Sequence, residues 1–300
     1  MNGHYYSLND YLKEKFGEKV YKLSIDLGLT CPNRDGSLHT RGCIFCLGGS
    51  SHFSAQSGDI HEKIENAKKL VSKKTKAEKF IAYFQSYTNT YAPVEFLESV
   101  FTQAINREDI VAISVATRPD CLPEKVVELL ARLNKIKPVW VELGLQTAKE
   151  ESVNYIRRCY DNTVYKDAVA RLSQKGIEVI THVIIGLPKE SKEDILNTVD
   201  FAVNCGTKGI KLQLLHVLKG TDLCEDYEKG EFKTLSIEEY ADILFDCIRR
   251  LPESVVVHRI TGDAPKIHLV SPLWSADKKT VINTINRKMK ECNLKQGEHR

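Results

Sequence analysis

Three cysteines near the amino terminus have a spacing that is typical of metal and iron–sulfur sites. Cys43 and Cys46 form a CxxC pair, and Cys31 lies twelve positions upstream. Three thiolates supply three corners of a cubane cluster, whereas a ferredoxin-type [4Fe–4S] cluster takes four. An iron without a protein ligand has an open coordination position, and open positions are typical of catalytic metal sites. The spacing therefore favours a cluster that does chemistry.

Two other interpretations of these cysteines stay open at this point. A structural zinc site would need a fourth ligand, which His39 or His52 could supply. The three thiols could also be unrelated buried side chains, because one CxxC pair with a distant third cysteine is only moderately specific. The remaining cysteines are scattered singly, so we expect each to be a core residue or a neutral surface residue.

Composition and charge narrow the class of protein. The chain has 300 residues, of which 42% are hydrophobic, and this is enough for a large core. Residues 1–10 are polar and no apolar run approaches the roughly eighteen residues of a membrane span, so we expect a cytoplasmic protein without a membrane partner. The net charge of +3 does not indicate nucleic-acid binding. Lysine-rich segments at 68–79 and 278–290 support RNA binding only weakly, since solvated helix faces have the same composition.

Apolar runs of strand length alternate with helical patterns along the chain. The expected strands are Val20–Ile25, Phe80–Phe84, Ile110–Thr117, Val139–Leu145, Ile177–Gly186, Gly209–Val217 and Val255–Ile260. The expected helices are His61–Lys79, Val94–Asn106, Pro123–Asn134, Asn162–Gln174, Ser191–Asn204 and Ser236–Leu251. Wholly apolar strands that alternate with helices predict an α/β fold with a parallel sheet covered by helices.

The number of strands predicts an incomplete barrel. A closed eight-stranded barrel needs one more strand–helix unit than the chain offers, so we predict a partial (β/α)6-type barrel of parallel strands with a short C-terminal extension. No linker divides the chain, and residues 1–300 are expected to form one domain, with a core over about 20–235 and the extension over about 236–300. Val255–Ile260 could belong either to the sheet or to the extension.

Ligands in such folds bind at the carboxyl ends of the strands. Polar residues follow the expected strands at the cysteine segment, Gln85–Asn89, Thr117–Asp120, Gln146–Thr147, Gly186–Pro188, His216 and Lys219–Thr221. Because parallel strands end at one edge of a sheet, we expect these residues to converge on one rim.

With these motifs the sequence resembles the radical S-adenosylmethionine (SAM) superfamily, and in it the branch related to the radical domain of the catalytic Elongator subunit. The matching segments are the three cysteines with Phe45, Thr-Arg-Pro-Asp at 117–120, Val-Glu-Leu-Gly-Leu-Gln at 141–146, Ile-Arg-Arg at 156–158, His-Val-Ile-Ile-Gly-Leu-Pro at 182–188 and Lys-Gly-Thr at 219–221. The long step from Cys31 to Cys43 fits this branch, whereas Ala116 stands where related enzymes often have a glutamate. We expect no acetyltransferase domain after the barrel, so acetyl transfer is not implied.

The resemblance implies a [4Fe–4S] cluster on Cys31, Cys43 and Cys46, and SAM chelated at the open iron. An electron from a donor such as flavodoxin or ferredoxin would then cleave SAM to a 5′-deoxyadenosyl radical. The residues that the resemblance places near SAM are Phe45, Gln85, Ser86, Thr117, Gln146, Arg158, His182 and Gly186. Arg158 is expected to bind a carboxylate through two N–H groups, and Arg118 or Arg158 is expected to pair with Glu142.

The sequence also resembles a short bacterial radical SAM family that carries Cys-Pro-Asn-Arg-Asp-Gly and Thr-Arg-Pro-Asp-Cys-Leu and has been linked to tRNA wobble uridine. The implied step converts carboxymethylaminomethyl-uridine to aminomethyl-uridine in tRNA, and Lys219 or Arg259 could hold a phosphate or the carboxylate of the modification. Two alternatives stay open: a radical SAM enzyme that acts on a peptide or a small metabolite, and a zinc or iron–sulfur module that senses redox state. The sequence does not determine the oligomeric state.

Overall fold

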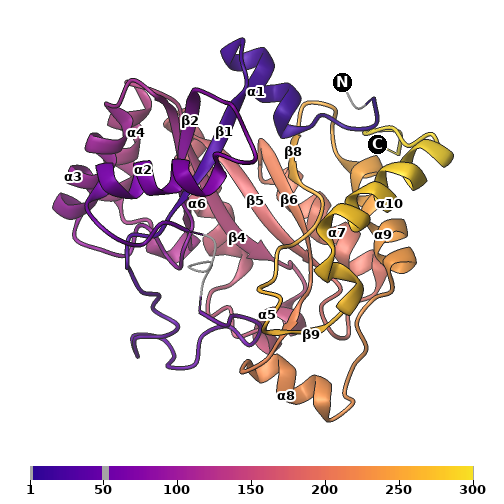
Figure 1. Cartoon of the computed structure of the whole chain (residues 1–300). Coiled ribbons are helices and arrows are strands. Elements are labelled where there is room, and N and C mark those ends of the chain that lie inside the picture. Colours follow the sequence, from indigo (N-terminus) through magenta and orange to yellow (C-terminus); the bar gives the residue numbers. More distant parts are fainter. Residues whose placement is uncertain (1–2, 49–53, 300) are drawn as a thin grey trace.

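A parallel sheet that curves into part of a barrel forms the centre of the protein (Figure 1). The structure is a computed structural model that describes residues 3–48 and 54–299. The seven strands are β1 Val20–Ile25, β2 Lys79–Phe84, β3 Ile110–Thr117, β4 Val139–Gln146, β5 Glu178–Ile185, β6 Gly209–Leu214 and β8 Val256–Arg259. They lie in the order β1-β2-β3-β4-β5-β6-β8, and each neighbouring pair is parallel. The predicted α/β partial barrel is confirmed, and the last strand belongs to the main sheet.

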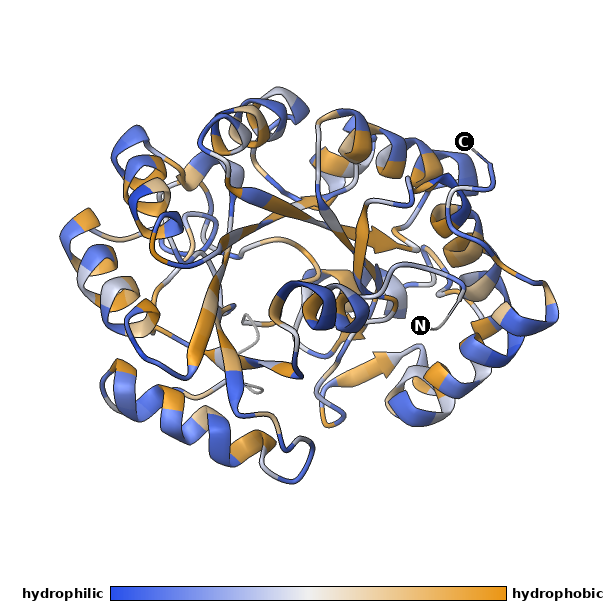
Figure 2. Cartoon of the chain, turned by 90° about the horizontal axis from the view of Figure 1, so that it is seen from above, coloured by the Kyte–Doolittle hydropathy of each residue, from blue (hydrophilic) through white to orange (hydrophobic). Residues whose placement is uncertain are grey.

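Helices cover the outer face of this sheet, and Figure 2 shows them around the strands. The covering helices are α2 Ile60–Val71, α3 Val94–Ile105, α4 Glu124–Asn134, α6 Asn162–Gln174, α7 Lys192–Asn204, α9 Ile237–Arg250 and α10 Lys278–Glu291. The apolar pattern of the sequence does not predict α1 Leu8–Phe16, α5 Glu150–Tyr155, α8 Asp222–Glu228 or the antiparallel pair β7 Val217–Leu218 and β9 Leu269–Ser271. These elements are short, so they contain too few turns or residues to produce a clear apolar period.

Helix α2 is shorter than predicted. The pattern predicted a helix from His61 to Lys79, but the helix ends at Val71 and Lys79 already begins β2. Ile64 and Ala67 are buried as an amphipathic helix requires, whereas Leu70 is 60% exposed. The lysine-rich stretch that follows offers no apolar face to hold further turns against the sheet.

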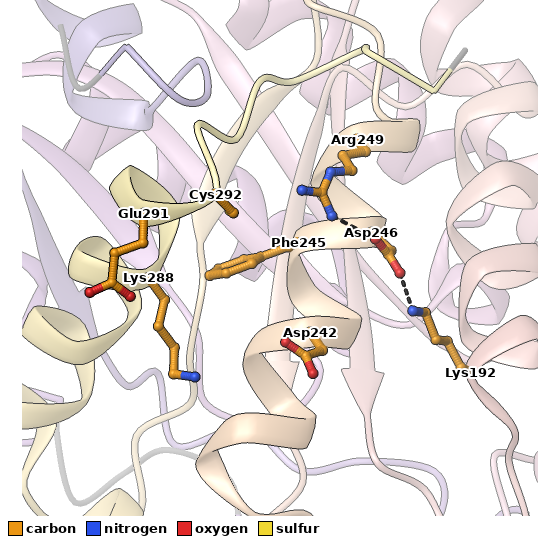
Figure 3. A pocket seen from close by; sticks show the side chains of 8 residues that line it. All are labelled: Lys192, Asp242, Phe245, Asp246, Arg249, Lys288, Glu291 and Cys292. Carbon is orange, nitrogen blue, oxygen red and sulfur yellow. Dashed lines mark hydrogen bonds and ion pairs between the residues drawn. The ribbon is translucent and has the colours of Figure 1, made fainter.

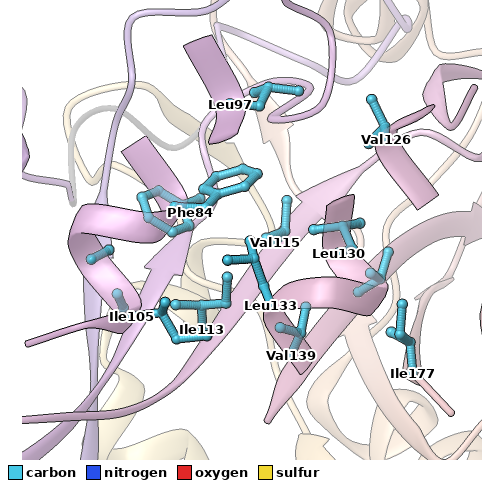
Figure 4. Packing of buried hydrophobic residues seen from close by; sticks show 14 of the residues in the cluster. Phe84, Leu97, Ile105, Ile113, Val115, Val126, Leu130, Leu133, Val139 and Ile177 are labelled. Atoms are coloured by element: carbon cyan, nitrogen blue, oxygen red, sulfur yellow. The ribbon is translucent and has the colours of Figure 1, made fainter. Parts of the chain in front are cut away.

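The outer face of the sheet is buried in two large hydrophobic clusters. In the first, Phe84, Val115 and Val139 of the sheet pack against α3 and α4, as Figure 4 shows. In the second, side chains of β5 and β6 pack against α7, α9 and α10, so residues beyond 236 share a core with the barrel. Ile285 of α10 is fully buried in this second cluster.

Helix α1 closes the amino end of the barrel. Its Leu12 packs with Ile81, Trp140 and Ile180, which point inward from β2, β4 and β5. Figure 1 shows α1 at one end of the strands and α5 and α8 at the opposite, carboxyl end. Because apolar side chains fill the amino end of the barrel, a ligand enters from the carboxyl rim.

The packing of α10 leads to a test of stability. Ile285→Ala should lower the free energy of unfolding by about 2–5 kcal/mol, because it removes fully buried methyl groups and leaves a cavity. Ile267→Ala is the matched control, since Ile267 is 83% exposed, and it should change the unfolding free energy by less than about 0.5 kcal/mol. Urea unfolding followed by circular dichroism measures both. Equal effects of the two variants would show that α10 does not contribute to the core.

Candidate active site

The CxxC segment is held at the carboxyl end of the barrel by backbone hydrogen bonds from two other elements. The N–H of Ile44 donates to the carbonyl of Ile156 at 3.3 Å, and the N–H of Leu223 donates to the carbonyl of Ile44 at 3.0 Å. Within the segment, the N–H of Cys46 donates to the carbonyl of Cys43 at 3.0 Å. The end of α5 and the start of α8 thus fix the positions of two thiols.

Two polar side chains that are not among the predicted site residues hold the same loop. Asn33 is fully buried, and its Nδ2 donates to the carbonyl of Arg157 at 2.7 Å and lies 3.5 Å from the Sγ of Cys43. Arg34 donates to the carbonyl of Cys46. A buried asparagine and an arginine between ligand cysteines are not distinguishable in the sequence from ordinary polar loop residues.

Asp222 at the start of α8 connects the loop to the neighbouring elements. Arg41 of the cysteine loop and Arg157, just after α5, both form ion pairs with its carboxylate. One carboxylate shared by two guanidinium groups ties three segments that are far apart in the sequence.

The protein environment disfavours the thiolate form of Cys43. Burial raises the pKa of Cys43 to about 12, and the thiols of Cys46 and Cys31 act in the same direction. A bound metal centre reverses this preference, because a coordinating thiol is deprotonated. Three free thiols in one partly buried loop therefore suit a cationic iron centre.

The described residues do not form a compact site for a single metal ion. In residues 3–48 and 54–299, no three histidine, cysteine, aspartate or glutamate side chains converge as closely as one ion requires. The Nδ1 of His39 accepts a hydrogen bond from the N–H of Arg41 at 3.0 Å, and His52 lies outside the described residues.

Two of the predicted SAM contacts have buried polar atoms without a hydrogen-bond partner. Ser86 is fully buried and its Oγ has none, and the same holds for Oε1 of Gln146. Gln146 ends β4 with a φ of 65°, and a Cβ on Gly144 would lie 2.9 Å from its Nε2, so glycine makes room for this amide. Unsatisfied buried polar atoms cost free energy unless a ligand pairs with them. Both residues therefore fit a polar cofactor at this rim.

Three other predicted SAM contacts already have protein neighbours. Gln85 donates to the Oγ of Ser54 at 3.0 Å, and the hydroxyl of Thr117 lies 2.5 Å from that of Thr90. Phe45 packs against the apolar cluster of Ile44 and its neighbours. Their contact with SAM stays a prediction.

Gly186, directly after β5, has a conformation that other residues adopt only with strain. Its φ is 97°, and a Cβ there would lie 3.0 Å from Leu235. The requirement for glycine is thus explained by a turn and by close packing, and its approach to the adenine of SAM stays a prediction.

The guanidinium of Arg158 donates to acceptors within the protein. Its Nη1 donates to the carbonyls of Leu145 and Thr147 at 2.8 and 2.7 Å, and its Nε donates to the carbonyl of Tyr160 at 3.0 Å. Nη2 donates to Oδ1 of Asn162 at 2.9 Å. Four of the five N–H groups are therefore occupied, and the predicted bidentate binding of a carboxylate by Arg158 stays a prediction. Arg158 anchors the turn after β4.

Glu142 is the hub of a polar cluster inside the barrel. Lys22 Nζ and Ser114 Oγ each donate to Oε1 at 2.7 Å. His182 Nε2 lies 2.8 Å from Oε2, and Lys211 also donates to Oε2. The prediction that Arg118 or Arg158 pairs with Glu142 is wrong: Arg118 binds Asp120, and the partners of Glu142 point inward from neighbouring strands.

The charges of this cluster are set by their mutual contacts. Burial alone would raise the pKa of Glu142, but the ammonium groups of Lys211 and Lys22 outweigh burial and hold it well below the usual range. Burial lowers the pKa of Lys211 to about 7, although Glu142 acts in the opposite direction. Burial, with Lys211 beside it, lowers the pKa of His182 to about 4. At neutral pH His182 is therefore a neutral ring that donates to an ionised carboxylate.

Two family models match this chain. The Radical SAM superfamily matches residues 39–202, and the Radical_SAM C-terminal domain matches residues 207–291. The chain belongs to the radical SAM superfamily. Its cofactors are therefore a [4Fe–4S] cluster and SAM. The cysteine loop and the unpartnered polar atoms at the rim are compatible with both.

Relatives place this radical SAM enzyme near the Elongator-like branch, as predicted. YtqA of Bacillus subtilis (strain 168) is 42% identical over 296 residues, which are 98% of this chain and 92% of YtqA. A tRNA uridine(34) acetyltransferase of Methanocaldococcus jannaschii is 28% identical over 167 residues, which are 53% of this chain and 30% of that protein. The structure of Methanocaldococcus infernus Elp3 with an N-terminal deletion has a TM-score of 0.71 at 19% identity, over 92% of this chain and 64% of the other. This chain spans less than two thirds of the last two proteins, and the structural likeness shows the fold.

A groove on the outside of the enzyme is separate from this rim. It lies among α7, α9 and α10, where Lys192 and Arg249 both pair with Asp246 (Figure 3). Since these charges satisfy one another, the groove adds nothing to the chemistry of the cysteine loop. None of the described helices is long and apolar enough to cross a membrane.

The structural role of Arg158 can be separated from a role in SAM binding. Arg158→Met should lower the free energy of unfolding by about 3 kcal/mol, because it leaves buried carbonyl oxygens without donors. Arg132→Met is the control, since Arg132 is exposed and pairs with the exposed Glu98, and it should have little effect. Urea unfolding measures stability, and equilibrium dialysis with the reconstituted enzyme measures SAM affinity. Unchanged stability with lost SAM affinity would contradict the structural role.

Because two histidines are buried, we expect the free energy of unfolding to fall in mild acid. Burial lowers the pKa of His182 and of His216 to about 4, from an ordinary value near 6.5. As the pH falls through this interval, the unfolded chain takes up protons that the folded chain does not, so the unfolding free energy falls by at most about 3 kcal/mol for each histidine. Urea unfolding between pH 7 and pH 4.5 checks this, and His216→Gln should reduce the slope. Constant stability from pH 7 to 5 would contradict the neutral state of both rings.

Proposed function

We propose that this radical SAM enzyme converts carboxymethylaminomethyl-uridine to aminomethyl-uridine at the wobble position of tRNA. In this reaction the bond between the amine nitrogen and the carboxymethyl carbon would be cleaved with one water after loss of a hydrogen atom and an electron, so that the fragment leaves as glyoxylate, and SAM would be the oxidant, ending as methionine and 5′-deoxyadenosine. The observation that carries the proposal is the similarity to a tRNA uridine(34) acetyltransferase, a protein named for its action on this nucleotide. The shared fold with an archaeal Elp3 over 92% of this chain supports it. We do not propose acetyl transfer for this protein, because this chain spans only 30% of that acetyltransferase.

The proposed roles follow from the positions of the side chains. Cys31, Cys43 and Cys46 would hold the cluster, while Asn33 and the ion pairs of Asp222 keep their loop in place. Ser86 and Gln146 would satisfy their buried polar atoms on SAM. Once bound, the cluster and SAM supply a 5′-deoxyadenosyl radical when an electron arrives from a donor protein such as flavodoxin or ferredoxin.

The interior of the barrel suits a polar substrate group. Lys22, His182 and Lys211 line it together with Glu142, and all but Glu142 keep some exposed side-chain surface. An apolar substrate would exclude the remaining solvent from these polar groups without offering them a hydrogen bond, at a cost in free energy. A wobble base in an anticodon loop is already largely unstacked, so extending its modification into the barrel requires little distortion of the RNA.

A direct test is anaerobic reconstitution with iron and sulfide, followed by incubation with SAM, dithionite and tRNA that carries carboxymethylaminomethyl-uridine. Mass spectrometry of the nucleosides should show deoxyadenosine, loss of the modified uridine and gain of aminomethyl-uridine. Deoxyadenosine without any change in the tRNA would refute the wobble-uridine substrate and favour a peptide or a small metabolite.

Cysteine variants test the cluster itself. Cys43→Ala should lose most of its iron, acid-labile sulfide and SAM cleavage, because each cysteine supplies one corner of the cluster. Cys292→Ala is the control, since Cys292 is an exposed free thiol at the end of α10, and it should keep the wild-type iron content. Stoichiometric zinc and no SAM cleavage in the wild-type protein would refute the radical mechanism.

A further inference from the structure

A bulge in the seventh strand turns Arg259 toward the inside of the barrel. Ile210 of β6 pairs with Val257 of β8, but the next residue, Lys211, pairs with Arg259, so β8 has one extra residue at this step. Such a bulge redirects the side chains that follow it. Paired residues of neighbouring strands point to the same face of a sheet. Arg259 therefore points inward together with Lys211.

Other interactions place the Arg259 guanidinium near inward-facing groups of several strands. After burial, which dominates, Arg259 contributes to the lowered pKa of His182 and of Lys211. The charge of Arg259 also lowers the pKa of Tyr83, whereas burial, which dominates, raises it. These groups belong to β2, β5 and β6, so the charge of Arg259 acts across the barrel interior.

Arg259 is less engaged with protein acceptors than the two lysines inside the barrel. Lys22 and Lys211 both bind the fully buried Glu142. Arg259 forms an ion pair through Nη2 with Asp263 at 3.0 Å, and its side chain remains 32% exposed. Asp263 also binds Lys278 at 2.5 Å, so its charge is shared between two cations.

The level of the barrel between the Glu142 cluster and the rim is lined in part by small side chains. Ser24, Ala116 and Gly144 lie two residues beyond Lys22, Ser114 and Glu142 on their strands and therefore share their inward direction. Ser24 and Gly144 keep exposed surface. Arg259 pairs with Lys211, the third of the six residues of β6, so it lies in the middle of the sheet at the level of the Glu142 cluster, directly below these small side chains.

We propose that Arg259 binds the carboxylate of the carboxymethylaminomethyl group, an assignment that rests on the proposed function. A guanidinium presents a planar pair of N–H donors that matches a carboxylate, and it keeps its charge at every pH that the enzyme meets. The product lacks this carboxylate, because its side chain ends in a primary amine. Arg259 therefore distinguishes substrate from product and favours release of the shortened side chain.

The test compares two nucleosides and two kinds of variant. Isothermal calorimetry on the reconstituted enzyme with SAM should show that carboxymethylaminomethyl-uridine binds about tenfold or more tightly than aminomethyl-uridine, as expected for a charged hydrogen-bonded pair. Arg259→Gln should abolish this difference and raise KM for the modified tRNA by a similar factor, and Arg259→Lys should retain part of it. Arg287→Gln is the matched control, because Arg287 is exposed on α10 and pairs with Glu291, and it should behave as wild type.

Failure of this assignment is distinguishable from failure of the proposed function. If the wild-type enzyme does not convert the modified tRNA, the proposed function is refuted and the assignment with it. If the wild type converts the tRNA but Arg259→Gln keeps the wild-type KM and affinity difference, only the role of Arg259 is overturned. Thermal unfolding of each variant controls for folding, and Asp263 keeps Lys278 as a partner in Arg259→Gln. Arg259→Lys, which keeps the charge, provides the second comparison if Arg259→Gln does not fold.

Discussion

The interior of this barrel depends on one buried carboxylate. Glu142 has no exposed side-chain surface, and an ionised group in that position is tolerated only when it is fully paired. Its four partners come from β1, β3, β5 and β6, so satisfying one charge fixes the relative positions of side chains on most of the sheet. The same requirement makes the interior polar, in contrast to the apolar outer face that packs against the helices.

The polar interior is bounded at the amino end and at the carboxyl end of the barrel by different residues. Below it, Leu12 of α1 joins an apolar layer that includes Trp140 and closes the amino end. Above it, the cysteine loop and the buried polar atoms of Ser86 and Gln146 mark the carboxyl rim. A cofactor at the rim would therefore face a charged chamber, and a substrate that reaches this chamber must carry polar or charged groups to match it.

The two halves of the chain meet at the cysteine loop. Asp222, in the part matched by the C-terminal family model, pairs with Arg41 and Arg157, in the part matched by the superfamily model. The backbone of Leu223 continues this contact by donating to Ile44 between two of the cysteines. The C-terminal part therefore positions the proposed cluster ligands as well as enclosing the barrel, and through β8 it supplies Arg259.

The alternation of strands and helices, the cysteine spacing and the polar residues at strand ends could all be read from the sequence, because each of these is a local pattern of side-chain types. Which charges meet depends on the tertiary structure. Lys22 and Glu142 are 120 positions apart, and Lys211 and Glu142 are 69 apart, so strand order and register bring them together instead of Arg118 or Arg158. The structure also assigned Arg158 to backbone carbonyls and turned Arg259 inward through a bulge. The direction of a side chain at a bulge or a turn depends on hydrogen bonds to another strand, and no local pattern encodes those bonds.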